Sequence, residues 1–294
     1  MKKRSVIILL SFLTLAVTSC IKESLDDCFQ WMRIELRWIS TQPVDYNESV
    51  KIEVIPLTPE SEYEITSDVY GVNVNFRVGG YKIIGHENSS NIDINYDDLT
   101  VAVGTSSDGM ALEPDIFSAG STTANVEVHD ESLVIPLPMY KQARTLFIGT
   151  DFIGDGAPLI SRIEGVLHGI TLKRNLDNGF PPVNELTRPP AITNGSIRYN
   201  LTPLTRALDD AWFADSKRLL GIDGNTEQVI DLTVFYNNGG TATASIDITE
   251  QMAGFHTQDI NEPWYVIITL EAGIGLTVEI VDWISGPESW IIAQ

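Results

Sequence analysis

The chain has 294 residues, of which 43% are hydrophobic and 20% charged, so it can form one large or two medium globular domains and is not a disordered chain. It contains 40 Asp and Glu against 19 Lys and Arg, which gives a net charge of −21. This negative net charge repels the phosphate backbone of nucleic acids, so we expect no nucleic-acid partner. We also expect no electrostatic binding to anionic lipids through a cluster of basic residues.

The first twenty residues have the parts of a bacterial secretory signal. Residues 2–4 are basic, residues 5–16 are largely apolar, and the small residues 17–19 precede Cys20. The apolar run is short for a transmembrane helix, which needs about 20 residues. The ending resembles a lipobox, in which the cysteine receives diacylglycerol and becomes the new N-terminus. We predict a signal peptide at 1–19 and lipidation of Cys20; the alternative is an ordinary signal before a chance cysteine.

An acidic stretch, residues 21–27, follows Cys20. It resembles the surface-export signal of Bacteroidales lipoproteins, and a solvated acidic tether is the alternative. We predict a lipidated tether at 20–30. If Cys20 carries lipid, Cys28 has no partner within the chain, which leaves no disulfide and no Cys-x-x-Cys metal site. Cys28 is then a small buried hydrophobe or a tether residue, and we favour the buried position.

Strict alternation of apolar and polar residues, which is typical of half-buried strands, recurs through the first half of the chain. The predicted strands lie at 34–38, 50–54, 72–78, 92–96 and 99–103. Turns are predicted at the glycine pair 79–80 and at the aspartate pair 97–98.

The second half repeats this pattern. Strands are predicted at 230–236 and 242–248, joined by the hairpin turn 237–240, where Asn and Gly tolerate the positive φ of primed turns. A further pair is predicted at 264–270 and 276–280. The best helical signal is 202–220, where Thr202 can cap the start, Pro203 suits the first turn and Gly221 can end the helix. We predict a short helix or helical loop there.

Many antiparallel strands separated by turns predict an all-β fold of sandwich type. Pro136 and Pro138 flank a strand end and favour a boundary near 138, because proline is excluded from central ladders. We therefore predict two tandem antiparallel β-sandwich domains, at 31–138 and 139–294. The proline-rich stretch 180–190 is interpreted as a long loop within the second domain.

No catalytic, cofactor-binding or metal-binding motif is recognisable, so we predict a protein that is not an enzyme. The histidines lack ligand spacing, the acidic segment 149–156 lacks the alternating oxygens of a calcium loop, and the aspartate pairs are interpreted as solvated turns rather than a glycosidase pair. The positions considered are His86, His129, His168, His256, Asp97, Asp98, Asp151, Asp155, Asp209 and Asp210.

The six tryptophans are the other candidates for function. Trp38 and Trp264 lie within strand patterns and are expected in the core, whereas Trp31, Trp283 and Trp290 lie near the ends of the fold. These three either cover the edges of a sandwich or form a platform for sugar rings.

Together these features resemble the Bacteroidales fimbrillin-associated lipoproteins, the anchor and accessory proteins of fimbriae. The resemblance rests on short motifs spread over the chain: the Cys20 lipobox, Asp26-Asp27-Cys28, the strand 34–38, the turn 78–82, the junction 136–138 and Asp282-Trp283.

The resemblance implies two transthyretin-like β-sandwiches, attachment to the outer membrane through Cys20, and a role as a fimbrial anchor or assembly subunit. It implies no catalytic residues. A neighbouring fimbrial subunit would add a strand to an open sheet edge of this chain, because residues 290–294 are too short to donate one. We place that edge in 139–294, because the short tether holds the first domain near the membrane and the second domain is farther from the lipid. The alternative is a surface glycan-binding lipoprotein of a polysaccharide-uptake system, which needs exposed aromatics such as Trp212 or Trp283.

Overall fold

A computed structural model describes residues 29–39, 49–58, 62–127, 132–176, 191–204, 211–256, 260–272 and 278–286. The predicted signal peptide, Cys20 and Cys28 lie outside the described residues. Within these residues, helical structure is confined to the 3-10 turn η3 (Ala157–Leu159) and the single turn α2 (Thr249–Met252). All other described elements are β-strands, which confirms the all-β prediction.

A seven-stranded sheet contains most of the first half of the chain, in the order β3-β2-β5-β8-β9-β1-β4. Its pairs are antiparallel except for β1 and β9, which run parallel. The strands are β1 (Phe29–Ile39), β2 (Val50–Pro56), β3 (Tyr63–Ser67), β4 (Gly71–Arg77), β5 (Gly79–Glu87), β8 (Ser118–Val126) and β9 (Leu133–Lys141).

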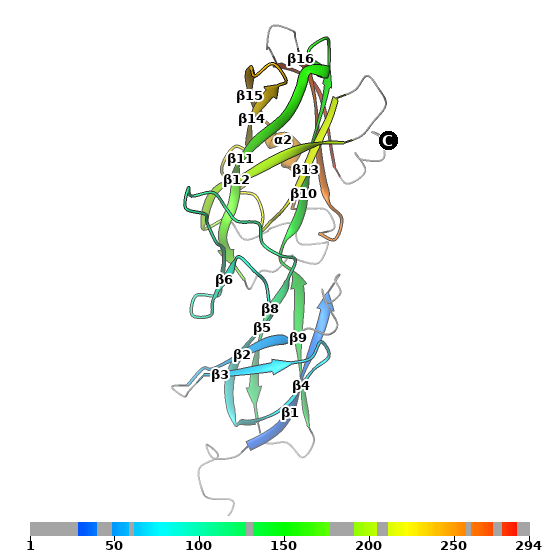
Figure 1. Ribbon diagram of the computed structural model, residues 1–294. Helices are drawn as coiled ribbons and strands as arrows, with labels where there is room; N and C mark the ends of the chain where they lie inside the picture. Colours follow the sequence, from blue (N-terminus) through cyan, green and yellow to red (C-terminus); the bar gives the residue numbers. More distant parts are fainter. Residues whose placement is uncertain are drawn as a thin grey trace, which may run out of the picture.

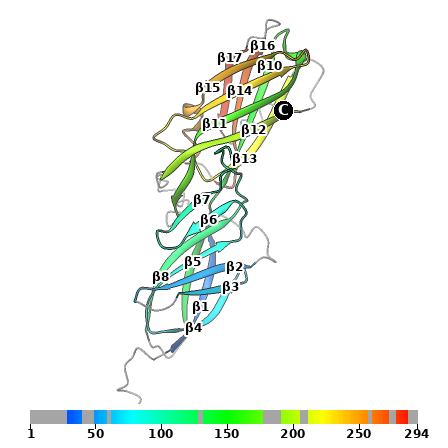
Figure 2. The ribbon, with the colours of Figure 1, turned by 60° about the vertical axis from the view of Figure 1, so that its left-hand side comes forward.

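A ten-stranded sheet follows, in the order β15-β14-β11-β12-β13-β10-β16-β17, with the hairpin β6–β7 attached to β11. Figures 1 and 2 show the two sheets end to end in an elongated molecule. The strands are β6 (Ile92–Asn95), β7 (Thr100–Val103), β10 (Arg144–Ile153), β11 (Ile160–Asn175), β12 (Thr193–Leu204), β13 (Ala211–Leu219), β14 (Val229–Tyr236), β15 (Thr241–Asp247), β16 (Trp264–Ala272) and β17 (Val278–Gly286).

Each sheet folds over a core of its own. In the seven-stranded sheet the alternating residues Met32, Ile34 and Leu36 of β1 are buried, and they pack in one cluster with Leu137 and Met139 of β9. Every second side chain of a strand points to the same face, so the apolar residues of the alternating sequence pattern are the ones buried in this core.

The second core extends into the first sheet and joins the two halves. It includes Val101 of the β6–β7 hairpin, Phe117 just before β8, and Ala119 within β8, together with buried residues of β10 to β16. The hairpin also pairs with the end of β11, from Lys173 to Asn175. The two sheets are therefore held by continuous apolar packing as well as by the chain connection.

The predicted helix at 202–220 is wrong. Its described parts belong to β12 and β13, and β13 pairs with β10 from Ala211 to Leu219. Local propensity favours a helix there, but burial of Trp212 and Phe213 between neighbouring strands overrides it. Residues 205–210, including Asp209 and Asp210, lie outside the described residues.

The proline-containing segment 136–138 is a continuous part of β9 and does not end the strand. Beside Pro138, β8 and β9 approach so closely that a Cβ on Gly120 would lie 1.7 Å from the Pro138 carbonyl oxygen. Strands β8 and β9 pair at Ser118–Lys141 and Ala119–Tyr140. The chain passes from one sheet to the other between Lys141 and Arg144. The division into two domains at 138 stays a prediction.

The predicted hairpin turn at 237–240 is confirmed between β14 and β15. Gly239 has φ +85°, a conformation that residues with a Cβ rarely adopt, and the Tyr236 N–H donates to the Gly240 carbonyl oxygen at 2.9 Å. This turn fixes the register of β15, which is important below.

Candidate functional site

Strand β15 forms one border of the ten-stranded sheet. In the described part of the chain it pairs with β14 alone, so the other side of its backbone is in no sheet ladder, although β17 approaches it to within 8 Å between Cα atoms. Figure 1 shows β15 near the end of the molecule opposite to the start of β1. An unpaired strand edge presents N–H and C=O groups that can template another strand.

The backbone groups that face outward from β15 follow from its register. Ile248 donates to the Gln228 carbonyl at 2.8 Å, and Tyr236 donates to Gly240 at 2.9 Å. Bonded pairs alternate in antiparallel ladders, so 242, 244 and 246 bond to β14. The intervening residues Thr241, Thr243, Ser245 and Asp247 therefore direct their backbone N–H and C=O groups away from the sheet.

The β15 edge lacks the usual protection against strand addition. Within Thr241–Asp247 there is no proline, lysine or arginine, and the one charged residue, Asp247, is at its end. Strand β3 is an edge strand of the seven-stranded sheet, and its Glu64 lies opposite Glu53 of the neighbouring strand β2. Burial, and then the negative charge of Glu64 and Glu62, raise the pKa of Glu53. That acidic edge repels an incoming strand more strongly than β15 does.

The junction between the sheets is organised around two buried polar side chains, Gln142 and Arg174. Gln142 follows β9 and donates to the carbonyls of Ala119 and Tyr140, each at 3.0 Å. The guanidinium of Arg174, near the end of β11, donates to the Gln142 carbonyl at 2.9 Å and to its Oε1 at 2.6 Å. Burial lowers the pKa of Arg174 to about 10, so it stays charged at neutral pH.

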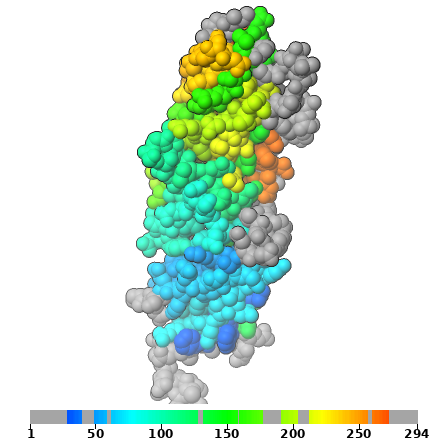
Figure 3. All heavy atoms as spheres, in the orientation of Figure 1, coloured from blue at the N-terminus to red at the C-terminus, as the bar shows by residue number. Residues whose placement is uncertain are grey.

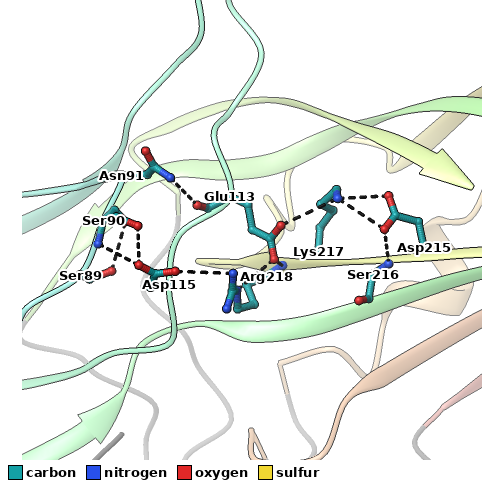
Figure 4. Close-up of polar contacts among 9 residues, drawn as sticks. All are labelled: Ser89, Ser90, Asn91, Glu113, Asp115, Asp215, Ser216, Lys217 and Arg218. Carbon is teal, nitrogen blue, oxygen red and sulfur yellow. Dashed lines mark hydrogen bonds and ion pairs between the residues drawn. The ribbon is translucent and has the colours of Figure 1, made fainter. Parts of the chain in front are cut away.

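A row of ion pairs on the surface reinforces this junction (Figure 4). Arg218 of β13 pairs with Glu113 at 2.9 Å and with Asp115 at 3.6 Å, both in the segment between β7 and β8. Asp115 also accepts a hydrogen bond from the Ser90 N–H at 3.2 Å. Partly exposed pairs contribute modestly each, but as a network they fix this segment against the second sheet.

The described histidines make local contacts. His86 is buried, with Nε2 2.8 Å from the Tyr96 hydroxyl, and burial lowers its pKa. His256 Nε2 lies against the backbone of Ile222. Among the described residues, no group of three or more His, Cys, Asp or Glu is placed to hold a metal ion. His129 lies outside these residues.

His168 joins Ser196 at 2.7 Å and Asp231 at 3.1 Å, each through one ring nitrogen. The three residues have the composition of a hydrolase triad, and they lie on neighbouring strands β12, β11 and β14. These three strands lie in the interior of the ten-stranded sheet, where β11 pairs with both β12 and β14. We interpret the group as a polar cross-strand contact.

The acidic segments considered from sequence are turns or strand ends. Asp97 and Asp98 lie in the turn between β6 and β7, where Asp98 pairs with Lys173 of β11 at 3.3 Å. Asp151 is within β10 and Asp155 lies in the turn that follows it. The expected solvated turn at 97–98 is confirmed; it also anchors the hairpin to the second sheet.

The tryptophans divide by burial. Trp264 is buried, as predicted, and Trp38 is half-buried against the first core. Trp212 is only 3% exposed, so it cannot serve as the sugar platform that the glycan alternative requires. Trp31 is 62% exposed. The side chain of Trp283 and all of Trp290 lie outside the described residues.

Comparison with solved structures identifies proteins of the same fold. A candidate adhesin from Bacteroides ovatus superimposes with a TM-score of 0.61 at 15% identity, over 88% of this chain and 94% of that one. The fimbrial anchor protein Mfa2 of Porphyromonas gingivalis gives 0.56 at 8% identity, over 88% and 98%. A candidate polysaccharide-binding protein from Bacteroides thetaiotaomicron gives 0.53 at 10% identity, over 88% and 98%.

Comparison of the sequence with family models and with curated proteins gives no match. The structural likeness therefore establishes the fold, which this chain shares with adhesin candidates and a fimbrial anchor. In the described part of the chain, no helix has the length and apolarity needed to cross a membrane.

Proposed function

We propose that this protein is a lipid-anchored component of the outer membrane that holds a fimbrial subunit at the cell surface, as an anchor or accessory assembly protein without enzymatic activity. Cys20 carries the lipid, and the chain from 139 to 294 receives the subunit. The shared fold with a fimbrial anchor supports the class of protein. The lipobox-like segment before Cys20 supports the attachment.

The observation that carries the proposal is the open β15 edge. It lies at the far end of an elongated molecule from the strand that follows the tether (Figure 1). An incoming strand would bond to the outward groups of Thr241, Thr243 and Ser245, while its alternate side chains would contact the borders of the sandwich. The packed junction at Gln142 and Arg174 would transmit force between the two ends.

Replacing Thr243 with Pro is expected to abolish co-purification with the neighbouring fimbrial subunit. Proline removes one outward N–H and places its ring at the approach of the partner strand, but it breaks no hydrogen bond to β14. We expect capture to fall by at least about tenfold, equivalent to about 1.4 kcal/mol or more of lost binding. The measurement is pull-down from cells that make the fimbria.

Thr243→Val is the matched control, because it changes the exposed side chain and keeps the N–H. It should capture the subunit normally. Unfolding curves of both variants must match that of the parent chain. If Thr243→Pro folds and still captures the subunit, β15 does not receive the strand and this assignment is wrong.

A further inference from the structure

An exposed apolar patch lies on the outer face of the seven-stranded sheet, where β1 begins. Phe29 and Trp31 alternate with the buried residues Gln30 and Met32, so both point away from the core. They are 56% and 62% exposed, and Val134 on the neighbouring strand β9 is 47% exposed. We call Phe29, Trp31 and Val134 the aromatic patch. Large side chains left in water as a group mark an interaction surface.

The same face carries cationic side chains beside the aromatic patch. Arg77 lies opposite Phe29 in the β1–β4 pairing, with its guanidinium 5.5 Å from the ring centroid. Arg33 lies opposite Val134 and donates to the Tyr70 carbonyl at 3.3 Å. The chain as a whole has a net charge of −21, whereas two positively charged arginines lie beside these exposed aromatic side chains.

The aromatic patch lies at the end of the molecule from which the tether leaves. Figures 1 and 3 show the start of β1, in dark blue, at the lower end of the elongated molecule, remote from the ten-stranded sheet. Cys20 precedes Phe29 by nine residues. Nine extended residues span at most about 32 Å, so a lipid on Cys20 keeps this end of the protein close to the bilayer surface.

We propose that the aromatic patch rests on the lipid surface and sets the orientation of the anchored protein. Tryptophan and phenylalanine favour the interface between headgroups and acyl chains, and arginine meets lipid phosphates while its stem stays apolar. The inference rests on the proposed anchoring through Cys20, because the tether is what brings the patch to the bilayer. The contact directs the elongated molecule, and with it the β15 edge, outward from the membrane.

A tether that does not depend on acylation tests the contact. The chain from residue 21 to 294, with a hexahistidine tag in place of residues 1–20, is bound to phosphatidylcholine vesicles that contain a nickel-chelating lipid. The tag and the aromatic patch then act as two linked binding elements, so the patch strengthens the apparent affinity. We expect a variant with Phe29→Ser, Trp31→Ser and Val134→Ser to bind these vesicles about tenfold more weakly than the parent chain.

The matched control replaces Ile153, Leu159 and Ile192 with Ser, because these exposed hydrophobic residues all belong to the second half of the chain. It should bind like the parent. Trp31→Tyr, which keeps an interfacial aromatic, should lose less affinity than Trp31→Ser. All variants change exposed side chains, and their circular dichroism spectra should match that of the parent.

Two results would overturn the inference. One is equal vesicle binding by the parent and the patch variant. The other is a parent chain that sediments as a dimer without lipid while the patch variant is a monomer, which would assign the patch to a second copy of the chain. The tag replaces the acyl group, so neither result depends on whether Cys20 is lipidated, and failure of the anchoring proposal is detected separately by membrane fractionation.

Discussion

Replacing Arg144 with Ala is expected to lower the free energy of unfolding by about 3–5 kcal/mol, as when a buried charged or large side chain is removed. Arg144 is fully buried at the first position of β10. Its Nε donates to the Glu262 carbonyl at 2.9 Å, and Nη1 donates to the Phe255 carbonyl. The guanidinium lies between the rings of Phe255 and Trp264, 5.4 and 5.2 Å from their centroids.

Alanine would leave a cavity between the two rings. It would also leave both carbonyl groups buried without the hydrogen bonds that Arg144 donates. Equilibrium urea unfolding measures the loss. Arg162→Ala is the control, since Arg162 also lies over a ring, that of Phe235, but is exposed. It should cost less than about 1 kcal/mol. A loss at Arg144 no greater than that at Arg162 would contradict the structural role assigned to the buried guanidinium.

Replacing Arg174 with Ala is expected to cost about 2–4 kcal/mol and to loosen the junction between the sheets, because Gln142 loses the donor to its carbonyl and its Oε1. Unfolding should then show the two sheets separating before global denaturation. Hydrogen exchange is the direct measurement, and the backbone amides of β7 and of the end of β11 should exchange faster than in the parent chain.

Lys173→Ala is the neighbouring control. Lys173 makes a partly exposed ion pair with Asp98 at 3.3 Å, and its loss should cost less than about 1 kcal/mol. If Arg174→Ala destabilises the protein without any faster exchange at the junction, the guanidinium supports the core of the second sheet and does not couple the two sheets.

Alternation predicted the strands whose two faces differ. In β2 and β14 every second residue is buried, so the period of two is visible in the sequence. In β11 the period is interrupted, because Gly169 with φ +75° shifts the pairing with β12 between His168 and Ile170. In β13 consecutive residues are buried, and the remaining pattern suits a helix as well as a strand.

The candidate site was predictable in part. That an edge in the second half receives a strand is implied by the family resemblance and stays a prediction; sheet order decides which strand is an edge, and long-range pairing determines that order. Gln142 and Arg174 are not recognisable from the sequence as a junction, because the two residues meet only after β9 and β11 have been placed.

Membrane fractionation of a Cys20→Ala variant, in cells that assemble the fimbria, tests the central claim most directly. The fimbrial subunit and this protein are followed together in the membrane and in the medium. If the protein is a lipid-held anchor, the variant leaves the membrane fraction and fimbriae appear in the medium, whereas the parent retains both. A variant that stays with the membrane and keeps its fimbriae attached would contradict the account.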